Sequence, residues 1–538
     1  MDDEQRAYRR AYDLLEGVQA EDPAGALADV VSAQRVARKR GWNRVDLVLQ
    51  LVAIVHDLVH GPDRRTDGRV EDLLAQARHT SQLAIVACAL GVRGVLKNAH
   101  GDTRQMLEDA ANAMVILDDD GLPSQDRATG YTILGAAYNS LRLWELTDEL
   151  YDLAAEAGRR DPAPVMRAAL AVNPVLIRVE WALALVEVGD EDGARREFAR
   201  AAEALGPARD TPMPQLWMQV AEGCSSVVDL LTDVHGADPG KVAADVSGLR
   251  ANGDREILPL LEATWLLARS RRAGTRAERR AVARDAAQLG VTTSPSSSSS
   301  TYPAWVRANV LTSMTRRHPR ASWLGRSRRA LAYQAQSDYT DLLARSSWES
   351  RRAVLAAAHA QIRVARSRAE RERLVHAAST DPLTGLSNRR VFEDWLSGTD
   401  PAGSPSALLL VDVDGFKRVN DTYGHAVGDD VLRALAEVLR ECEDSGDVLL
   451  RLGGDEFAVL VPRNVHPAAM EERTLRIRER VGAYPWDAIA DGLEVRVSCG
   501  SSIGQLHDPS EPGTARTATY RRADDDLYAS KGIRTRGA

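Results

Sequence analysis

The hydrophobic pattern of this chain changes its period near Ser379. Up to about residue 290 the sequence is rich in alanine and places apolar residues three or four positions apart, with short breaks of Gly, Asp and Pro. This spacing is typical of amphipathic helices. After Ser379, short apolar runs alternate with helical stretches, which indicates strands and helices in turn. We therefore predict a multidomain protein, all-helical over 1–290 and α/β over 379–538.

A small–large–small triplet recurs in loose form through the helical part. The triplets are Ala26-Val30-Ala33, Val70-Leu74-Ala77, Met106-Ala110-Ala113, Thr147-Tyr151-Ala154 and Ala194-Phe198-Ala201. Small residues let paired helices approach, and a large central residue fills the gap between neighbouring hairpins. The pattern resembles degenerate tetratricopeptide repeats, with a spacing longer and looser than their period of about 34 residues. We predict a tetratricopeptide-like repeat superhelix over 1–290, and an irregular helical bundle is the alternative.

Two segments connect these parts. Residues 291–301 include the run TTSPSSSSST, which predicts a flexible linker or exposed loop. Residues 302–378 are expected to be helical and to end in a short coiled-coil stalk. The bulky residues at seven-residue spacing that suggest the stalk are Trp348, Leu355 and Ile362. Arg351 and Glu372 interrupt this seam, so an ordinary helix packed on the repeat region is the alternative.

Composition limits the classes of partner. A net charge of −8, with 44% hydrophobic and 27% charged residues, is ordinary for a globular protein and argues against a broad nucleic-acid surface. The cysteines show no metal or disulfide spacing and are expected to be buried free thiols; they are Cys88, Cys224, Cys442 and Cys499. The acidic start and the interrupted apolar run Val45–Val59 favour a cytoplasmic protein with no membrane partner.

Two acidic pairs follow apolar runs in the α/β part. The expected strand Leu408–Val411 leads directly into Asp412 and Asp414, and Asp455-Glu456 lies at the tip of a hairpin made by two glycines. Carboxylates at neighbouring strand ends are costly unless a cation lies between them, and Mg²⁺ prefers oxygen ligands. Glycines let the backbone approach a ligand closely. The pattern predicts a Mg²⁺ site that handles phosphoryl groups.

Lysine is rare here, which makes its positions informative. The chain has 69 basic residues, and its lysines are Lys39, Lys97, Lys241, Lys417 and Lys531. Lys417 follows the first acidic strand end, and Lys531 closes the final expected helix. We predict that both contact phosphates as point charges, with chance placement as the alternative.

A series of motifs in the last part of the chain resembles the GGDEF family. They are Asp381-Pro382-Leu383-Thr384-Gly385-Leu386-Ser387-Asn388-Arg389-Arg390, Asp412 to Lys417, Asn420-Asp421, Gly424-His425, Gly428-Asp429, Arg451 to Phe457, Ala523-Asp524, Leu527-Tyr528 and Lys531. Their order makes a coincidental match improbable, although each alone is only suggestive. The resemblance implies a nucleotide-cyclase-like domain over 379–538, with a central, mostly antiparallel sheet flanked by helices.

The resemblance also implies a diguanylate cyclase that condenses two GTP into cyclic di-GMP, releases two pyrophosphates and uses Mg²⁺ or Mn²⁺. The expected metal ligands are Asp412, the Val413 carbonyl, Asp455 and Glu456. The expected substrate contacts are Phe416, Lys417, Asn420, Asp429, Gly453, Gly454, Lys531 and Arg534. The expected catalytic groups are Asp455, Glu456 and Lys417. Phe416 and Lys417 are expected on a loop around the phosphates, whereas Asn420 and Asp429 are expected to recognise guanine.

Each such domain offers one nucleotide site, so two copies must meet. The implied partners are therefore GTP, a second copy bound through the GGDEF domains and the helical region, and a protein or peptide on the repeats that regulates alignment. A catalytically silent GGDEF domain, acting as a GTP sensor or a repeat-based scaffold, is the alternative.

The sequence departs from the family pattern at two places. Asp444 stands where many members carry the arginine of an inhibitory RxxD site, with Asp447 at the motif's aspartate, so we expect no product feedback there. Thr535 stands where a phosphate-contacting arginine is usual, and Arg534 or Arg536 is expected to replace it.

Overall fold

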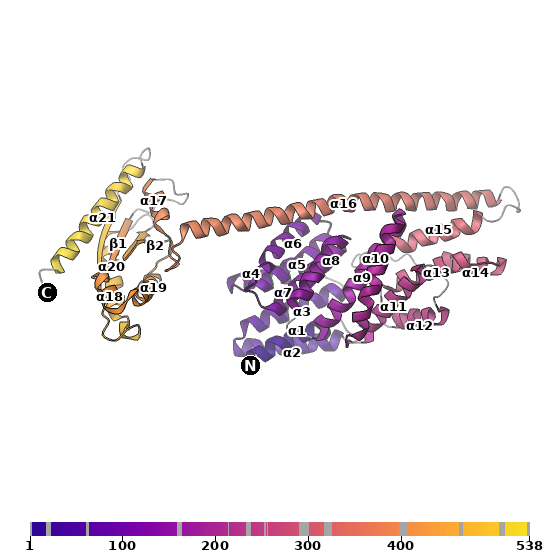
Figure 1. The fold of residues 1–538 in the computed structure, drawn as a ribbon, viewed down its shortest axis with the longest axis horizontal. Coiled ribbons are helices and arrows are strands. Elements are labelled where there is room, and N and C mark those ends of the chain that lie inside the picture. Colours follow the sequence, from indigo (N-terminus) through magenta and orange to yellow (C-terminus); the bar gives the residue numbers. More distant parts are fainter. Residues whose placement is uncertain are drawn as a thin grey trace. The chain divides into compact units, whose positions relative to one another are not determined.

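The computed structural model describes residues 3–17, 23–60, 64–158, 164–213, 215–232, 238–251, 254, 257–289, 301–316, 325–397, 407–461, 466–504 and 512–534. The chain divides into two compact units, Met1–Ser367 and Arg368–Ala538. Figure 1 shows that the first unit is made of helices and that the second contains a sheet.

The helices of the N-terminal unit follow one another along the chain. They are α1 (Asp3–Gly17), α2 (Pro23–Arg40), α3 (Asn43–His60), α4 (Arg64–His79), α5 (Leu83–Ala99), α6 (Thr103–Leu117), α7 (Ser124–Ser140), α8 (Trp144–Ala157), α9 (Pro164–Val188), α10 (Glu191–Asp210), α11 (Gln215–Thr232), α12 (Pro239–Ala251), α13 (Ile257–Arg272), α14 (Arg276–Gln288) and α15 (Tyr302–Arg316). Successive helices pack against each other, most closely α5 on α6, α7 on α8 and α9 on α10. The prediction of a helical N-terminal region is confirmed.

The recurring triplets lie on alternate helices of this unit. They fall on α2, α4, α6, α8 and α10. Their central residues Val30, Leu74 and Phe198 are buried. Gly135 of α7 packs so closely on α8 that an added Cβ would lie 3.2 Å from the Tyr151 ring. At this place a small residue faces a large one between two paired helices.

One described helix is long and apolar enough to cross a membrane by length and composition alone. It is the segment Met166–Val188 of α9, of which 61% is buried. Val175, Val179 and Leu183 belong to a hydrophobic core shared with the helices from α10 to α15. These apolar side chains therefore pack inside the N-terminal unit.

The helix α16 (Gly325–Ser379) is 55 residues long and continues from the N-terminal unit into the C-terminal unit. Ala358, Ile362 and Ala365 are buried in the same core as α1 to α8, and Trp348 packs beside Trp144 of α8. The seven-residue seam therefore faces this chain's own helices. The alternative of a packed helix describes this face, and a short stalk at the end of α16 stays a prediction. The predicted linker residues 291–300 lie outside the described residues.

The C-terminal unit is built on an antiparallel sheet. The strands described are β1 (Ala407–Val413), β2 (Val448–Gly453), β3 (Glu456–Val461) and β4 (Val497–Ile503), in the order β2-β3-β1-β4. Its helices are α17 (Arg389–Ser397), α18 (Phe416–Tyr423), α19 (His425–Glu441), α20 (Pro467–Ala483) and α21 (Pro512–Arg534), with a short 3₁₀ turn η2 (Trp486–Ala488). The expected antiparallel sheet flanked by helices is confirmed.

The central strand β1 is buried along its whole length because both faces of the sheet are covered. Leu409 and Val411 pack in a core with α19 and α20. Leu408 and Leu410 point to the other face, in a core with α17 and α21. The strand end after Val411 is thereby held in a fixed position.

The last strand and the final helix pack against each other. The strand β4 runs from Val497 to Ile503, and α21 runs from Pro512 to Arg534. Gly500 explains their close approach, since an added Cβ would lie 2.2 Å from the Ala523 carbonyl oxygen.

Candidate active site

The acidic residues meet at neighbouring strand ends. Asp412 on β1 lies opposite Glu456 on β3 and opposite Ser498 on β4. The Val413 amide donates to the Asp455 carbonyl oxygen at 3.2 Å, so the tip of the β2–β3 hairpin lies beside the end of β1. The antiparallel register therefore brings together two acidic pairs that are far apart in the sequence.

The Asp412 carboxylate is buried and forms an ion pair with Lys531. Burial is the main reason that the pKa of Asp412 is raised. The Lys531 ammonium opposes this shift and lies 2.7 Å from the Asp412 Oδ1 atom. The negative charges of Asp455 and Asp414 add to the upward shift. The carboxylates thus repel one another, and positive charge between them is favourable.

The next carboxylate along the loop is fixed by β4. The Ser498 hydroxyl donates to the Asp414 Oδ1 atom at 2.5 Å, and the Asp414 amide donates to the Arg496 carbonyl oxygen at 2.9 Å. No sequence motif pointed to Ser498. Its role follows from the β1–β4 register.

The donor set at these strand ends suits a hard divalent cation. Among the described residues, no group of three or more His, Cys, Asp or Glu side chains is arranged to hold a metal by itself. Mg²⁺ is commonly held by one or two carboxylates together with substrate phosphates and water. Asp412 and Asp455, with the Val413 carbonyl, fit that partial set, and Lys531 currently balances the Asp412 charge.

The phosphate segment after β1 is helical. Gly415 adopts φ +67°, and α18 begins immediately after it at Phe416. Phe416 is half-buried and Lys417 is exposed in the first turn. The expectation of a loop at Phe416 and Lys417 is therefore wrong. The first turn of a helix presents unpaired amide groups, so the position of Phe416 and Lys417 at the start of α18 favours phosphate binding.

The expected guanine-binding residues lie at the corner between α18 and α19. Gly428 of α19 has so little space that an added Cβ would lie 1.9 Å from the Asn420 Oδ1 atom and 3.3 Å from the Phe416 ring. Asn420, Phe416 and Gly428 therefore lie side by side, and the exposed Asp429 follows directly. Gly424, with φ +89°, makes the sharp turn between the two helices.

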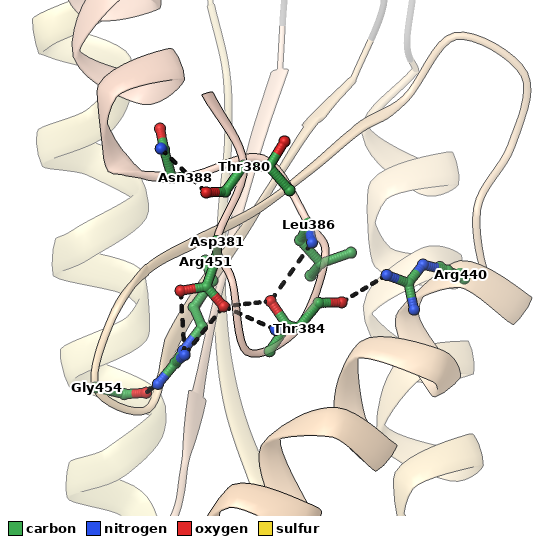
Figure 2. Close-up of polar contacts among 8 residues, drawn as sticks. All are labelled: Thr380, Asp381, Thr384, Leu386, Asn388, Arg440, Arg451 and Gly454. Carbon is green, nitrogen blue, oxygen red and sulfur yellow. Dashed lines mark hydrogen bonds and ion pairs between the residues drawn. The ribbon is translucent and has the colours of Figure 1, made fainter. Parts of the chain in front are cut away.

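The β2–β3 hairpin is held by Arg451. Gly453 and Gly454 have φ of +142° and +56°, and the Gly454 carbonyl accepts from the Arg451 Nε and NH2 atoms at 3.1 and 2.8 Å. The same guanidinium donates to the Asp381 carboxylate at 3.0 and 3.2 Å, as Figure 2 shows. Arg451 therefore connects the hairpin that carries Asp455 to the loop after α16.

That loop is itself fixed by hydrogen bonds. The Thr384 amide and hydroxyl both donate to the Asp381 Oδ1 atom, and Arg440 of α19 donates to the Thr384 carbonyl at 2.6 Å. Burial would raise the pKa of Asp381, but the bonds from Thr384 and Arg451 outweigh it, and the pKa is lowered. The sequence motifs contained Asp381, Thr384 and Arg451 but did not show how they pair, and they did not contain Arg440.

Asn388 caps the end of α16. Its side-chain amide donates to the Ala378 carbonyl at 2.8 Å, and its backbone amide donates to the Ser379 carbonyl at 2.8 Å. Figure 2 shows the longer bond of the same side-chain amide to the Thr380 carbonyl, at 3.4 Å. These bonds satisfy carbonyls that a helix end leaves unpaired. The last turn of α16 is thereby tied to the loop that holds Arg451.

The expected C-terminal contacts are only partly described. Lys531 lies on α21 and reaches the acidic strand end. Arg534 is the last residue of α21, and its side chain lies outside the described part. Thr535 and Arg536 lie outside the described residues altogether.

The place of the family's inhibitory site holds an ion-pair network. Asp447 is bound by Arg473, and Asp444 is paired with Arg473 and with Arg476 at 2.6 and 3.1 Å. The Asp444 amide also donates to the Asp447 Oδ2 atom at 3.0 Å. Both carboxylates therefore form ion pairs with arginines of α20.

Comparison with known proteins finds a family match in the part of the chain that holds this site. Residues 378–536 match the family model "Diguanylate cyclase, GGDEF domain". The chain is 36% identical over 171 residues to the diguanylate cyclase DgcM of Escherichia coli K12, which covers 30% of this chain and 38% of that protein. It is 37% identical over 171 residues to the cyclic di-GMP phosphodiesterase PdeR of the same organism, covering 31% and 25% respectively.

A solved structure is similar over the same part of the chain. The coiled coil and GGDEF domain of DgcB from Caulobacter crescentus, in complex with c-di-GMP, is 32% identical, covers 34% of this chain and 94% of that one, and has a TM-score of 0.29. The chain spans well under half the length of the curated relatives named above. The C-terminal part of this chain, residues 378–536, is a GGDEF domain.

Proposed function

We propose that this protein is a diguanylate cyclase, which condenses two GTP into cyclic di-GMP and releases two pyrophosphates. The observation that carries the proposal is that Asp412 and Asp455 lie at adjoining strand ends, with Lys531 beside Asp412. Asn420, at the turn between α18 and α19, is the residue proposed to bind guanine. The full-length activity is a proposal because the similarity covers only the C-terminal part.

Asp412, Asp455 and the Val413 carbonyl would hold Mg²⁺ or Mn²⁺, with Glu456 in support. A bound divalent cation lowers the pKa of a hydroxyl and neutralises charge that develops on a phosphoryl group. Lys531 would then move from Asp412 to the triphosphate, to which it offers a compact positive charge.

The remaining expected residues divide between phosphate and base. The first turn of α18 and the hairpin glycines would approach the phosphates with backbone amides, with Lys417 alongside. Arg534 is assigned to the phosphates only by position. Asn420 and Asp429 would bind the guanine edge, because an aspartate accepts from its N1–H and N2 groups, which adenine lacks.

Bond formation requires a second copy of the chain. The 3′-hydroxyl of one GTP would attack the α-phosphorus of the other, and pyrophosphate would depart. The hydroxyl proton would pass to Glu456 or to solvent. The same step would then join the 3′-hydroxyl of the second nucleotide to the α-phosphorus of the first. Since each domain holds one nucleotide, the homodimer aligns two half-sites. The helical region, which we propose to be tetratricopeptide-like, would set this alignment by self-association or by binding a protein or peptide. We place this activity in the cytoplasm.

Product analysis tests the proposal. Full-length protein incubated with GTP and Mg²⁺ should yield cyclic di-GMP, identified by chromatography and mass spectrometry, whereas Asp455→Ala should yield none. Asp430→Asn is the matched control, because Asp430 is exposed on α19 and pairs with Arg433 on the same helix. If the parent binds GTP but forms no product, the cyclase proposal is rejected and a silent GTP sensor is supported. We keep this sensor as the second candidate because the chain is also similar to the phosphodiesterase PdeR.

A further inference from the structure

A cavity of about 450 Å³ lies between α8 and α16 within the N-terminal unit. Its walls include Glu145 of α8 and, from α16, Trp348, Arg351, Arg352 and His359. The volume falls in the range of about 300–1,000 Å³ that is common for small-molecule sites. This cavity is separate from the GGDEF domain and has no part in the proposed synthesis of cyclic di-GMP.

The charge of the cavity is set by its arginines. Arg351 is 6% exposed and donates to both carboxylate oxygens of Glu145, at 2.6 and 3.0 Å. The single carboxylate of the lining is therefore neutralised. Arg352 is exposed and forms no ion pair within the described part of the chain. The net potential in the cavity is positive, and an anion is the favoured occupant.

A polar group in the cavity wall is left without a partner. The Nε atom of Arg351 is buried and has no hydrogen-bond acceptor among the described residues. An unpaired buried N–H is costly, more so when it belongs to a charged group. Arg351 thus keeps one N–H that Glu145 does not use, and an anion in the cavity can accept from it once the guanidinium shifts toward the opening.

The apolar part of the lining fits a ring. The guanidinium of Arg351 lies 4.1 Å from the Trp348 ring centroid and 5.3 Å from that of Trp144. Trp348 is half-buried, and Leu355 and Ala356 extend the apolar wall. An aromatic ligand can pack on such a surface while its charged group reaches the arginines.

We propose that this cavity binds a small aromatic anion, whose ring packs against Trp348 and whose carboxylate or phosphate oxygens accept from Arg351 and Arg352. The bound anion adds to the contacts that hold α16 against α8. Because α16 is one unbroken helix as far as Ser379, the ligand acts on the segment that leads into the GGDEF domain.

Calorimetric titration of the full chain with phenyl phosphate tests the site. We expect one site per chain, with inorganic phosphate and phenol each binding about tenfold more weakly, because each lacks one half of the interaction. Arg352→Gln should weaken phenyl phosphate about tenfold, whereas Arg345→Gln, another exposed arginine of α16 outside the cavity, should not. Trp348→Leu should weaken phenyl phosphate more than inorganic phosphate.

Hydrogen exchange locates the bound anion. Phenyl phosphate should slow amide exchange in residues 345–359 of the parent and leave the GGDEF domain unchanged. No detectable binding at about 10 mM, or equal binding by the Arg352→Gln and Arg345→Gln variants, would overturn the proposal. The test does not use cyclase activity, so its outcome is independent of the proposed function.

Discussion

The two units of this chain differ in what their sequences specify. In the N-terminal unit, the glycines with positive φ, Gly41, Gly101 and Gly189, follow helix ends. In the C-terminal unit, Gly415, Gly424, Gly453 and Gly454 shape the segments that carry the acidic and guanine-binding residues. Glycine therefore separates helices in one unit and positions functional groups in the other.

The polar contacts of the two units hold different parts of the structure. Asp381 and Arg451 are 70 residues apart and join two motifs at the site. In the N-terminal unit, polar pairs join helices that pack together, both neighbouring ones, such as Arg93 with Asp109, and distant ones, such as Arg351 with Glu145. Those pairs hold helices together, whereas the pair of Asp381 and Arg451 holds the hairpin that carries Asp455. Changes in the C-terminal unit should therefore affect catalysis, and changes in the N-terminal unit should affect stability.

Loss of a metal ligand should have the largest effect. Asp412→Asn keeps the shape of the side chain but removes the charge at the end of β1. We expect the rate of cyclic di-GMP formation to fall about 10³-fold, or about 4 kcal/mol in the activation barrier, with the fold intact. Steady-state rates and circular dichroism measure both quantities. Near-normal activity of the Asp412→Asn variant would contradict the proposal that the C-terminal unit places its functional groups at the strand ends.

Removal of Arg351 should have the largest effect on stability. Arg351→Ala leaves the half-buried Glu145 without its cation, and the free energy of unfolding of the N-terminal unit should fall by about 3 kcal/mol. Denaturant unfolding followed by hydrogen exchange should show the loss in the N-terminal unit only. The matched control is Arg345→Ala, which should be neutral. Equal loss of protection in residues 407–461 would contradict the separation of roles.

Stability of the N-terminal unit should depend on the pH through Glu187. Burial raises the pKa of this carboxyl to about 7, although the Thr301 hydroxyl and the Arg142 charge lower it. The folded protein therefore binds the proton more tightly than the unfolded chain between about pH 4.5 and 7, so stability is lost as the pH rises through this window.

The Glu187→Gln variant isolates that dependence. In the parent, the free energy of unfolding should fall by roughly 2 kcal/mol between about pH 5 and 8, measured by urea unfolding. In the Glu187→Gln variant this decrease should be absent. The exposed Glu191→Gln change is the control and should leave the profile unchanged. A parent and a Glu187→Gln profile of the same shape would show that Glu187 does not titrate in this range.

Arg451 should act as a positioning residue for the hairpin. Arg451→Gln removes the bonds to Asp381 and to the Gly454 carbonyl, and kcat should fall about tenfold, about 1.4 kcal/mol, with KM for GTP nearly unchanged. Arg451→Lys keeps the charge but not the two-sided bonding, and should recover only part of kcat. A rise in KM alone would instead place Arg451 in substrate binding.

Substitution of Asp444 should have the smallest effect. Because Asp444 is paired with Arg473 and Arg476, it offers no positive charge to a product phosphate. Inhibition of synthesis by added cyclic di-GMP should therefore be the same for the parent and for Asp444→Ala. Strong noncompetitive inhibition that disappears in Asp444→Ala would reverse this conclusion.

The strand ends of the site could be predicted from the sequence, but its supporting contacts could not. An apolar run that leads into Asp412 has one simple solution, a buried strand that ends at its carboxylate. The helix α18 was missed because it is only eight residues long and lies between Gly415 and Gly424, which resemble loop signals. The pairing of Asp381 with Arg451 was missed because a motif identifies residue types and not their partners.

The long helix α16 gives the same lesson from the N-terminal unit. The spacing of Leu355 and Ile362 correctly predicted a helix with one apolar face. The partner of that face could not be predicted, because a coiled coil and packing on the chain's own helices require the same spacing. Arg351 looked like an interruption because its partner Glu145 lies 206 residues away.

Binding of Mn²⁺ tests most directly whether Asp412 and Asp455 hold the cation for GTP. Electron paramagnetic resonance of the full chain with 3′-deoxy-GTP, which lacks the attacking hydroxyl, measures bound Mn²⁺ without turnover. We predict nucleotide-dependent Mn²⁺ binding by the parent and at least about tenfold weaker binding by the Asp412→Asn, Asp455→Asn double variant. Equal Mn²⁺ affinity in the two proteins would contradict the assignment of these carboxylates.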